Sequence, residues 1–415
     1  MFTKFKDDTT FIPKLEELLK PTLHGKIVKQ EVTPLTSFGE NFGSEILKVD
    51  VTVEENGKQR QVHGVGKLIP SSEVQLEIFN TQVTFKNEIG FYADIVPAMQ
   101  KFQREHGVAP TEYFPEMYGA RISLDPQSKV VDLNAILLLE NLKVKGFFTV
   151  DKYKGFDVDS TKTVLRALAN FQATTVALRK KKPDVFSSKV QPYLAEWTAP
   201  AFPEPLNVEP ILKENPNTAY LAIKAQNAIS KKRIKKIREP WACVTHNDLW
   251  VNNVMVRESN GMIQDIKFVD FQVIDYASPV CDLIFFLFSS VPNSVLRYHF
   301  DKLLQYYYKE FINTLSLYKV NTKEFSFESF EEELRLEGCY QVNHSIFMLF
   351  PILGSPEPPK PIGKVPQWDP NNEAGASNGD ADKKPAPGGI PQTFNLPMKE
   401  KVWYIVEEAA KHNWI

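Results

Sequence analysis

The most constraining feature of the sequence is a polar loop followed directly by a predicted hairpin. Residues 246–253 read HNDLWVNN, and residues 254–269 have the pattern of two short apolar strands joined by a turn. A hairpin begins and ends at the same edge of its sheet. We therefore expect Asn253, just before the first strand, to lie close to Asp270, just after the second.

This arrangement has the chemistry of a phosphoryl-transfer site. An amide oxygen from Asn253 and a carboxylate from Asp270 are hard ligands, which suit Mg²⁺ above all. Asp248 lies in the loop that enters the hairpin, where it can orient or deprotonate a hydroxyl that attacks a phosphoryl group. The alternative is that His246, Asp248 and Asn253 only cap a turn. Turn capping does not explain why Asp270-Phe271 follows at the separation of a kinase, so the catalytic interpretation is favoured.

The stretch from Thr245 to Leu283 resembles the ecdysteroid kinase-like family of insects, a branch of the choline kinase and aminoglycoside phosphotransferase group. The catalytic loop of that family resembles HGDLWxNN, and its metal motif is Asp-Phe-Gln, found here at residues 270–272. The resemblance covers about Leu35 to Phe350. It implies a protein-kinase-like fold that uses ATP and Mg²⁺ to phosphorylate small-molecule alcohols, with ecdysteroids as the namesake substrates. It also implies that His246 supports the loop and that Asp282 holds the loop backbone.

Three positions bear on this resemblance. Asn247 replaces the commoner Gly, which is expected to stiffen the loop and to leave the reactive groups intact. Gln172 stands where these families often have His, so it can hydrogen-bond but cannot titrate. Gln272, in place of the Gly of protein kinases, agrees with the small-molecule branch. The absence of an Ala-Pro-Glu element after Asp270 likewise makes a protein kinase less expected.

The phosphate-binding parts of a kinase are expected upstream. Between the first two predicted strands, backbone N–H groups could cradle the ATP phosphates, although glycines there more often only form a turn. The candidate residues of this tip are Gly39, Asn41, Phe42, Gly43 and Ser44. Lys67, near the end of the third strand, could reach the α- and β-phosphates. The alternative is an exposed edge lysine.

Two further parts complete the expected nucleotide site. Glu88 lies on the next predicted helix and is the expected ion-pair partner of Lys67, with an ordinary surface glutamate as the alternative. Residues 139–142, Leu-Glu-Asn-Leu, end a strongly apolar strand just before the helical part of the chain. A kinase hinge presents backbone groups to adenine at this place. Glu140 is expected to contribute its carbonyl group, and Leu142 is assigned to the same site.

The overall pattern predicts an α+β fold with two lobes. A small β-rich N-lobe, residues 1–140, would bind ATP, and a mainly helical C-lobe, residues 141–415, would carry the catalytic loop and the acceptor site. The N-lobe is expected to contain helices at 11–20 and 83–93, and strands at 26–35, 46–53, 59–68, 121–124 and 134–140. Residues 351–397 hold 11 of the 29 prolines, and from about 353 to 396 we expect a disordered surface loop before a last helix at 399–412.

Composition narrows the class of protein. The formal net charge of −2 favours neither nucleic acid nor an anionic membrane, and the basic runs at 179–182 and 231–238 are interpreted as solvated helix faces. The 3 cysteines are far apart, which indicates a reducing compartment. With no secretory signal and no apolar span, we expect a cytoplasmic protein without membrane insertion. The sequence leaves the oligomeric state open.

The acceptor is the least constrained part of this interpretation. Three stretches of the C-lobe, 146–160, 191–217 and 283–339, are rich in Phe, Tyr and Leu, which would suit a lipophilic alcohol such as an ecdysteroid. Apolar helices are nevertheless core more often than pocket. Two other classes remain open, a catalytically inactive kinase-fold protein that binds a ligand or acts as a scaffold, and a protein kinase.

Overall fold

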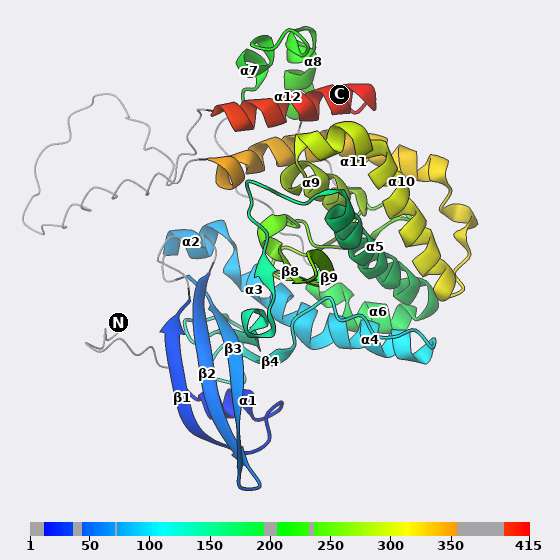
Figure 1. Cartoon of the computed structure of the whole chain (residues 1–415). Helices are drawn as coiled ribbons and strands as arrows, with labels where there is room; N and C mark the ends of the chain where they lie inside the picture. The colour runs from blue at the N-terminus through cyan, green and yellow to red at the C-terminus, as the bar shows by residue number, and fades with distance from the viewer. Residues whose placement is uncertain (1–11, 36–43, 71–72, 195–205, 232–235, 355–393) are drawn as a thin grey trace, which may run out of the picture.

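The computed structural model describes residues 12–35, 44–70, 73–194, 206–231, 236–354 and 394–415 (Figure 1). The fold is α+β, protein-kinase-like and bilobal, as the sequence predicts. An antiparallel sheet forms the N-lobe, and helices packed around two small antiparallel sheets form the C-lobe.

The N-lobe sheet has five strands in the order β1-β2-β3-β5-β4. They are β1 (Lys26–Pro34), β2 (Glu45–Glu55), β3 (Lys58–Leu68), β4 (Met117–Arg121) and β5 (Ile136–Glu140). Asn56 and Gly57 join β2 to β3 with φ angles of 51° and 74°, the positive pair that a tight hairpin requires. Helix α1 (Leu15–Leu19) lies against β4, and its leucines share one buried apolar cluster with alternate residues of β2. The expected hairpin is confirmed, and the expected first helix is shorter than predicted.

One strand was expected in the wrong place. The prediction was 121–124, but β4 ends at Arg121 because the polar residues after it form turns. Ser123 Oγ donates to Asp132 Oδ2 at 2.7 Å and accepts from Asp125 N at 3.0 Å. The backbone N–H of Asn134 donates to Asp132 Oδ1 at 2.8 Å, which delays the start of β5 to Ile136. Such side-chain bonds to nearby backbone compete with strand pairing.

The helix that crosses from the N-lobe to the C-lobe is longer than its predicted bounds of 83–93. After α2 (Glu73–Ile78) it consists of α3 (Thr81–Gly90), the π-helical turn η1 (Phe91–Ile95) and α4 (Val96–Glu105). The turn is closed by the N–H of Val96 donating to the carbonyl of Phe91, an i to i+5 bond. The three pieces follow one another without an intervening loop, and together they link the β sheet to the C-lobe (Figure 1).

The C-lobe is mainly helical and contains two small sheets, β6-β8-β9 and β10-β7. Its strands are β6 (Phe148–Thr149), β7 (Cys243–Thr245), β8 (Val254–Ser259), β9 (Met262–Phe268) and β10 (Asp275–Ala277). Its helices are α5 (Val158–Lys181), α6 (Pro183–Lys189), α7 (Glu209–Lys213), α8 (Ala222–Ile229), α9 (Val280–Ser290), α10 (Asn293–Leu317), α11 (Phe327–Leu353) and α12 (Leu396–Lys411). Short 3₁₀ turns lie at Leu142–Lys145, Gln191–Tyr193 (η3), Ala219–Leu221, Val251–Asn253 and Thr322–Glu324. Helix α9 is buried along its whole length and packs against α11.

The two ends of the predicted Pro-rich loop are helical. Helix α11 continues through Pro351 to Leu353, and α12 begins at Leu396, so the last predicted helix is confirmed and starts earlier than expected. Residues 355–393, most of the expected loop, lie outside the described residues. Helix α12 lies across α7 and α8 (Figure 1), where Trp403 Nε1 donates to the carbonyl of Ile211 at 2.8 Å. None of the described helices has the length and apolar character needed to cross a bilayer.

Candidate active site

Lys67 is the centre of a charged cluster between the two lobes. Its Nζ atom lies 2.6 Å from Glu88 Oε2 on α3 and 2.6 Å from Asp270 Oδ1, just after β9. Strand β3 lies between β2 and β5, and Lys67 is only 7% exposed, so the interpretation of an exposed edge lysine is wrong. The expected ion pair between Lys67 and Glu88 is present.

The cluster contains one ammonium group and two carboxyl groups. Burial opposes the charged form of Lys67, but Asp270 and Glu88 together raise its pKa above the ordinary value, so the ammonium group stays charged. Burial raises the pKa of Glu88, against the influence of Lys67 and with a further contribution from Asp270. Two carboxylates share one ammonium, and the cluster therefore carries excess negative charge when both are ionised. Such a cluster favours a cation.

Asp270 is held in place by the aromatic residue that follows it. Its φ of 70° lies in the left-handed region, which Asp tolerates better than most residues. Phe271 is fully buried and stacks on Phe91 of η1, with ring centroids 3.6 Å apart and an interplanar angle of 7°. The edges of Phe114 and Phe171 close the same cluster. The buried ring of Phe271 therefore fixes the position of Asp270. The side chain of Asp270 is still 31% exposed, so it can contact a ligand.

Asn253 and Asp248 are joined across the catalytic loop, residues 246–253. Asn253 Nδ2 donates to the backbone oxygen of Asp248 at 2.8 Å and to its Oδ2 at 3.1 Å. This orientation turns the amide oxygen, Oδ1, away from Asp248. The N–H of Val269 donates to the carbonyl of Asn253 at 3.1 Å, and Val254 pairs with Phe268, so the hairpin brings the residues before Asp270 against Asn253 as expected.

Asp248 is half-buried, and its partial burial together with the negative charge of Asp270 raises the pKa of its carboxyl group to about 8. A carboxyl group whose pKa lies this close to neutrality can exchange a proton under ordinary conditions, which a general acid or base requires. Asn253 opposes the shift because its amide donates to the ionised form.

His246 supports this loop and does not titrate near neutrality. Its Nδ1 accepts from the N–H of Asp248 at 3.3 Å, so Nε2 carries the proton and donates to the carbonyl of Val269 at 2.9 Å. Burial lowers the pKa of His246 to about 4. The ring packs on Phe271 with centroids 4.5 Å apart. These contacts fit a supporting role, whereas a part in catalysis stays a prediction.

Asp282, on α9, holds the loop backbone from the C-lobe. Its Oδ2 accepts from the N–H of His246 at 2.8 Å and from Gln172 Nε2 at 2.8 Å, and its Oδ1 accepts from the N–H of Asn247 at 2.7 Å. Gln172 also accepts a hydrogen bond from the hydroxyl of Tyr307. Its side chain therefore donates one hydrogen bond and accepts another without a titratable group. Asn247 has a φ of 62°, which explains why Gly is common here and why Asn is tolerated.

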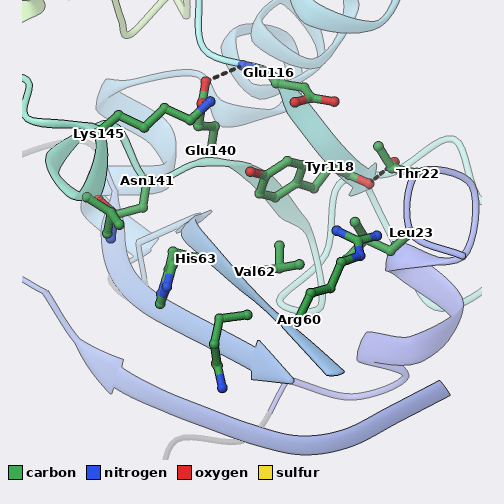
Figure 2. Close-up of a pocket in the computed structure, with 12 residues that line it drawn as sticks. Thr22, Leu23, Arg60, Val62, His63, Glu116, Tyr118, Glu140, Asn141 and Lys145 are labelled. Atoms are coloured by element: carbon green, nitrogen blue, oxygen red, sulfur yellow. Dashed lines mark hydrogen bonds and ion pairs between the residues drawn. The ribbon is translucent and has the colours of Figure 1, made fainter. Parts of the chain in front are cut away.

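The strand expected to lead into the hinge ends at Glu140, but the acidic side chain of Glu140 faces away from Lys67. Lys67 pairs with Leu137, whereas Glu140 pairs with Gly64 on the opposite face of the sheet. Figure 2 shows the carboxylate of Glu140 directed toward Lys145, with which it forms an ion pair. A role for Glu140 in adenine binding therefore depends on its backbone. The side chain of Leu142 is 3% exposed, and its expected nucleotide contact stays a prediction.

The pocket of about 270 Å³ beside the hinge is separate from the charged cluster. Figure 2 shows residues from β3, β4 and the hinge around it, together with Thr22 and Leu23 after α1. Neither Lys67 nor Asp270 is among its lining residues. The remaining predicted phosphate ligands, Gly39, Asn41, Phe42 and Gly43, lie outside the described residues, and Ser44 directly precedes β2.

The sequence interpretation did not consider three apolar side chains of β3, β5 and β8. Val65 is two residues before Lys67 on β3 and pairs with Leu139, so both share the face of Lys67. Met255 is half-buried and lies on the opposite face of β8 from the buried Val254 and Val256. Each of the three is half-buried between two buried neighbours, and this local alternation was a usable signal.

The aromatic residues expected to favour a lipophilic acceptor belong mainly to the core. Phe285, Phe286, Phe288 and Tyr307 are each 0% exposed. The neighbouring tyrosines have polar partners, since Tyr306 accepts from Arg166 Nη2 at 2.7 Å and Tyr308 donates to the carbonyl of Phe325 at 2.8 Å. These side chains give no support for a lipophilic acceptor pocket, and the core alternative is the correct one for the four buried residues.

Comparison with known proteins gives a family match and several remote structural matches. A proposed aminoglycoside phosphotransferase from Ralstonia eutropha JMP134 is 9% identical, with a TM-score of 0.37 over 81% of this chain and 94% of its own. An aminoglycoside phosphotransferase in complex with GDP and kanamycin is 13% identical, with a TM-score of 0.36 over 81% of this chain and 95% of its own. The comparison with curated proteins gives no match.

The family model of the ecdysteroid kinase-like family matches residues 38–320, about two thirds of the chain. This range contains Lys67, Glu88, the catalytic loop and Asp270. The chain therefore belongs to the ecdysteroid kinase-like family, and this membership supports a small-molecule phosphotransferase.

Proposed function

We propose that the protein is an ATP- and Mg²⁺-dependent kinase that phosphorylates a hydroxyl group of a small, lipophilic alcohol such as an ecdysteroid. The observation that carries the proposal is the buried contact of Lys67 with both Glu88 and Asp270, with Asp248 and Asn253 on the adjoining loop. Residues 1–140 would hold the nucleotide and residues 141–415 the acceptor. The namesake substrates of the family motivate the choice of acceptor, because the aromatic core of the C-lobe does not.

The residues present fit a magnesium site. Asp270 offers a partly exposed carboxylate, and Asn253 offers Oδ1 because its Nδ2 is already bonded to Asp248. Both are the oxygen ligands that Mg²⁺ prefers. When bound, Mg²⁺ would supply neutralisation of the negative charge of the phosphates. The excess negative charge around Lys67 would favour its entry.

The nucleotide would be positioned from both lobes. Lys67 would hold the α- and β-phosphates, while Glu88 fixes the direction of its ammonium group. The apolar side chains of Val65 and Met255 would contact the adenine ring, and the carbonyl group of Glu140 would accept from its amino group. The tip between β1 and β2, Gly39 to Ser44, would contribute backbone N–H groups.

Asp248 would act on the acceptor. Its carboxylate would orient the hydroxyl and take its proton as the new phosphate ester bond forms. His246 and Asp282 would act only through the loop backbone, which they hold in one conformation by the hydrogen bonds described above.

The cellular location is part of the proposal. None of the 3 cysteines forms a disulfide within the described residues, and Cys243 and Cys281 are buried. Free thiols are the usual state in a reducing compartment. We propose that the protein acts in the cytoplasm on a free small molecule rather than on nucleic acid or within a membrane.

The experiment is a search for phosphorylated products. The full chain is incubated with ATP, Mg²⁺ and a library of alcohols that includes ecdysteroids, and products are identified by mass spectrometry, with Asp270→Asn as the matched inactive variant. We expect a phosphate monoester of one alcohol class with the wild-type protein only. ATP binding without any product would favour an inactive kinase-fold binding protein. Phosphorylation of a peptide library in a parallel reaction would identify a protein kinase instead.

A further inference from the structure

Helix α3, which carries Glu88, is held on its opposite side by a tyrosine of the C-lobe. Successive residues of an α-helix are rotated by about 100°, so Glu88 and Gly90 point in nearly opposite directions. Glu88 reaches Lys67, whereas the ring of Tyr193, on η3, lies directly on Gly90. A Cβ atom at Gly90 would overlap this ring. The helix is therefore enclosed between Lys67 and Tyr193.

One carboxylate on the same helix is bound by both of its oxygens to the C-lobe. Tyr193 donates its hydroxyl to Asp94 Oδ2, and Lys189 Nζ lies 2.8 Å from Asp94 Oδ1. Asp94 lies in the π-helical turn, four residues after Gly90 and so on a neighbouring face of the helix. Lys189 is more than half exposed, and its ion pair is therefore weak. The ring contact and the hydroxyl bond of Tyr193 are the stronger part of the attachment.

The hydroxyl of Tyr193 remains a donor across the ordinary pH range. Burial and the bond to Asp94 raise the pKa of Tyr193 to about 12. Burial also acts on Asp94, but the bonds from Lys189 and Tyr193 outweigh it and lower its pKa below the ordinary value. The contact is thus a fixed one between a neutral phenol and a charged carboxylate, and no change of charge near neutrality releases it.

We propose that Tyr193 is a positioning residue that holds Glu88 against Lys67 and so keeps the nucleotide site assembled. The inference rests on the proposed function, because it assigns Tyr193 a part in nucleotide binding through Glu88. On the other flank of the helix Phe91 packs on Phe271, which follows Asp270. Near the start of α3, Gln82 exchanges two hydrogen bonds with Val131. Tyr193 supplies a restraint at the other end of α3, beside Gly90. Its removal allows α3 to move away from the sheet.

The test measures nucleotide affinity and helix motion in the full chain. Affinity for a non-hydrolysable ATP analogue with Mg²⁺ is measured by calorimetry without an acceptor, for wild type, Tyr193→Phe, Tyr193→Ala and Gly90→Ala. Tyr298→Ala, at a tyrosine that is 77% exposed on α10, is the matched control. We expect Tyr193→Ala to weaken binding by about 2- to 30-fold, Tyr193→Phe by less, and the control to have no effect.

Gly90→Ala separates positioning from simple stability. Alanine favours a helix more than glycine does, so without the contact to Tyr193 the substitution would leave nucleotide binding unchanged or tighter. The proposal predicts weaker binding, because the new methyl group overlaps Tyr193, and it predicts that Tyr193→Ala in the same chain relieves this defect. The variant Glu88→Gln gives a second way to separate positioning of Glu88 from an effect on stability. In that background, Tyr193→Ala should cause little further loss, since it acts through Glu88.

Hydrogen exchange gives a readout that does not depend on ligand. Tyr193→Ala should increase deuterium uptake in peptides from residues 81–95, whereas Tyr298→Ala should not. The proposal would be overturned if Tyr193→Ala had the nucleotide affinity and the deuterium uptake of the wild type. It would also be overturned if Tyr193→Ala caused the same loss of affinity in the Glu88→Gln background as in the wild-type background. If Tyr193→Ala fails to fold, Tyr193→Phe, which keeps the ring, decides by the same measurements. A wild-type protein that binds nucleotide and transfers no phosphate would refute the proposed function and leave this inference standing.

Discussion

The interlobe site and the contact between α9 and α12 each bury one lysine, with opposite consequences. Lys67 is 7% exposed and Lys401 is 8% exposed. Lys67 contacts two carboxylates, which raise its pKa despite its burial. Lys401 donates to the carbonyl of Val291 at 2.5 Å, and no ion pair is found for it within the described parts of the chain. Burial lowers its pKa to about 7.

The difference shows what distinguishes a site from a core contact. The amine of Lys401 satisfies a carbonyl group at the C-terminal end of α9, a task for which a neutral donor is enough. Around Lys67 three ionisable groups are brought together, although removing charges from water costs free energy that their attraction often does not recover. Because burying charges costs free energy, a buried charged cluster is expected where its charge takes part in binding or catalysis. The same degree of burial therefore marks structure in one lobe and chemistry between the lobes.

The largest expected effect comes from removing the second carboxylate of Lys67. Asp270→Asn keeps the shape of the side chain and loses the negative charge that would bind Mg²⁺. We expect turnover to fall by more than about 10⁴-fold, since metal stabilisation of phosphoryl charge is worth several kcal/mol. Asn253→Ala should be milder and partly restored by raised Mg²⁺ or Mn²⁺. Product formation at saturating ATP measures both, and an active Asp270→Asn enzyme would contradict the metal assignment.

Asp248→Asn tests whether chemistry and binding are separate in the same region. We expect kcat to fall by about 10²- to 10⁴-fold, the usual contribution of a positioned general base. Affinity for ATP and Mg²⁺ should stay near that of the wild type, because the metal is assigned to Asn253 and Asp270. Calorimetry and product formation give the two quantities independently. Loss of nucleotide binding with an unchanged kcat would show that the roles in this loop are assigned wrongly.

The same substitution at the two lysines gives a direct comparison. Lys67→Met should weaken ATP affinity by about 10- to 100-fold, because a hydrogen bond to a charged group contributes roughly 1.5 to 3 kcal/mol. Lys401→Met should leave ATP affinity unchanged, since Lys401 lies on α12 and donates to α9. Calorimetry on both variants, with melting curves to confirm folding, is the measurement. Similar losses at both positions would mean that Lys67 affects ATP only through general stability.

The parts of the site that could be predicted from the sequence are those fixed by local rules. The polar loop, the hairpin after it and Asp270 follow from turn chemistry and strand alternation over 25 residues, the span from His246 to Asp270. The partnership of Lys67 and Glu88 was expected only as one of the kinase parts that the family resemblance implies. Family resemblance added the role of Asp282, whose bonds to the loop backbone the structure shows.

The parts that could not be predicted depend on contacts between distant segments. The contact of Tyr193 with Gly90 joins residues more than a hundred positions apart, and neither residue has a local signature. The π-helical turn after Gly90 has no sequence rule that would have extended the predicted helix to Glu105. Periodicity also cannot separate core from pocket, which is why Phe285 and Tyr307 remained candidates for an acceptor surface until their burial was known.

The smallest expected effect concerns stability at the second lysine. The unfolded chain releases the proton of Lys401 near its ordinary pKa of 10.5, whereas the folded chain releases it near 7. Between these values the unfolded state binds more protons, so the free energy of unfolding rises with pH across this window. Below about pH 7 both states are protonated, and the cost of burying the ammonium group is present in full. Wild type should therefore gain stability relative to Lys401→Met from about pH 7 to about pH 10.

We expect this relative gain to be about 1 to 4 kcal/mol, or a few degrees in Tm, with the full shift as its upper bound. Melting curves of wild type and Lys401→Met over this range measure it, and the difference between the two proteins removes the contributions of other titrating groups. Lys302→Met, at an exposed lysine of α10, controls for the loss of a surface charge and should run parallel to the wild type. A constant difference between wild type and Lys401→Met would show that Lys401 stays charged in the folded protein. Lys67 and Lys401 would then both carry a charged ammonium group, and they would differ only in the groups that their side chains contact.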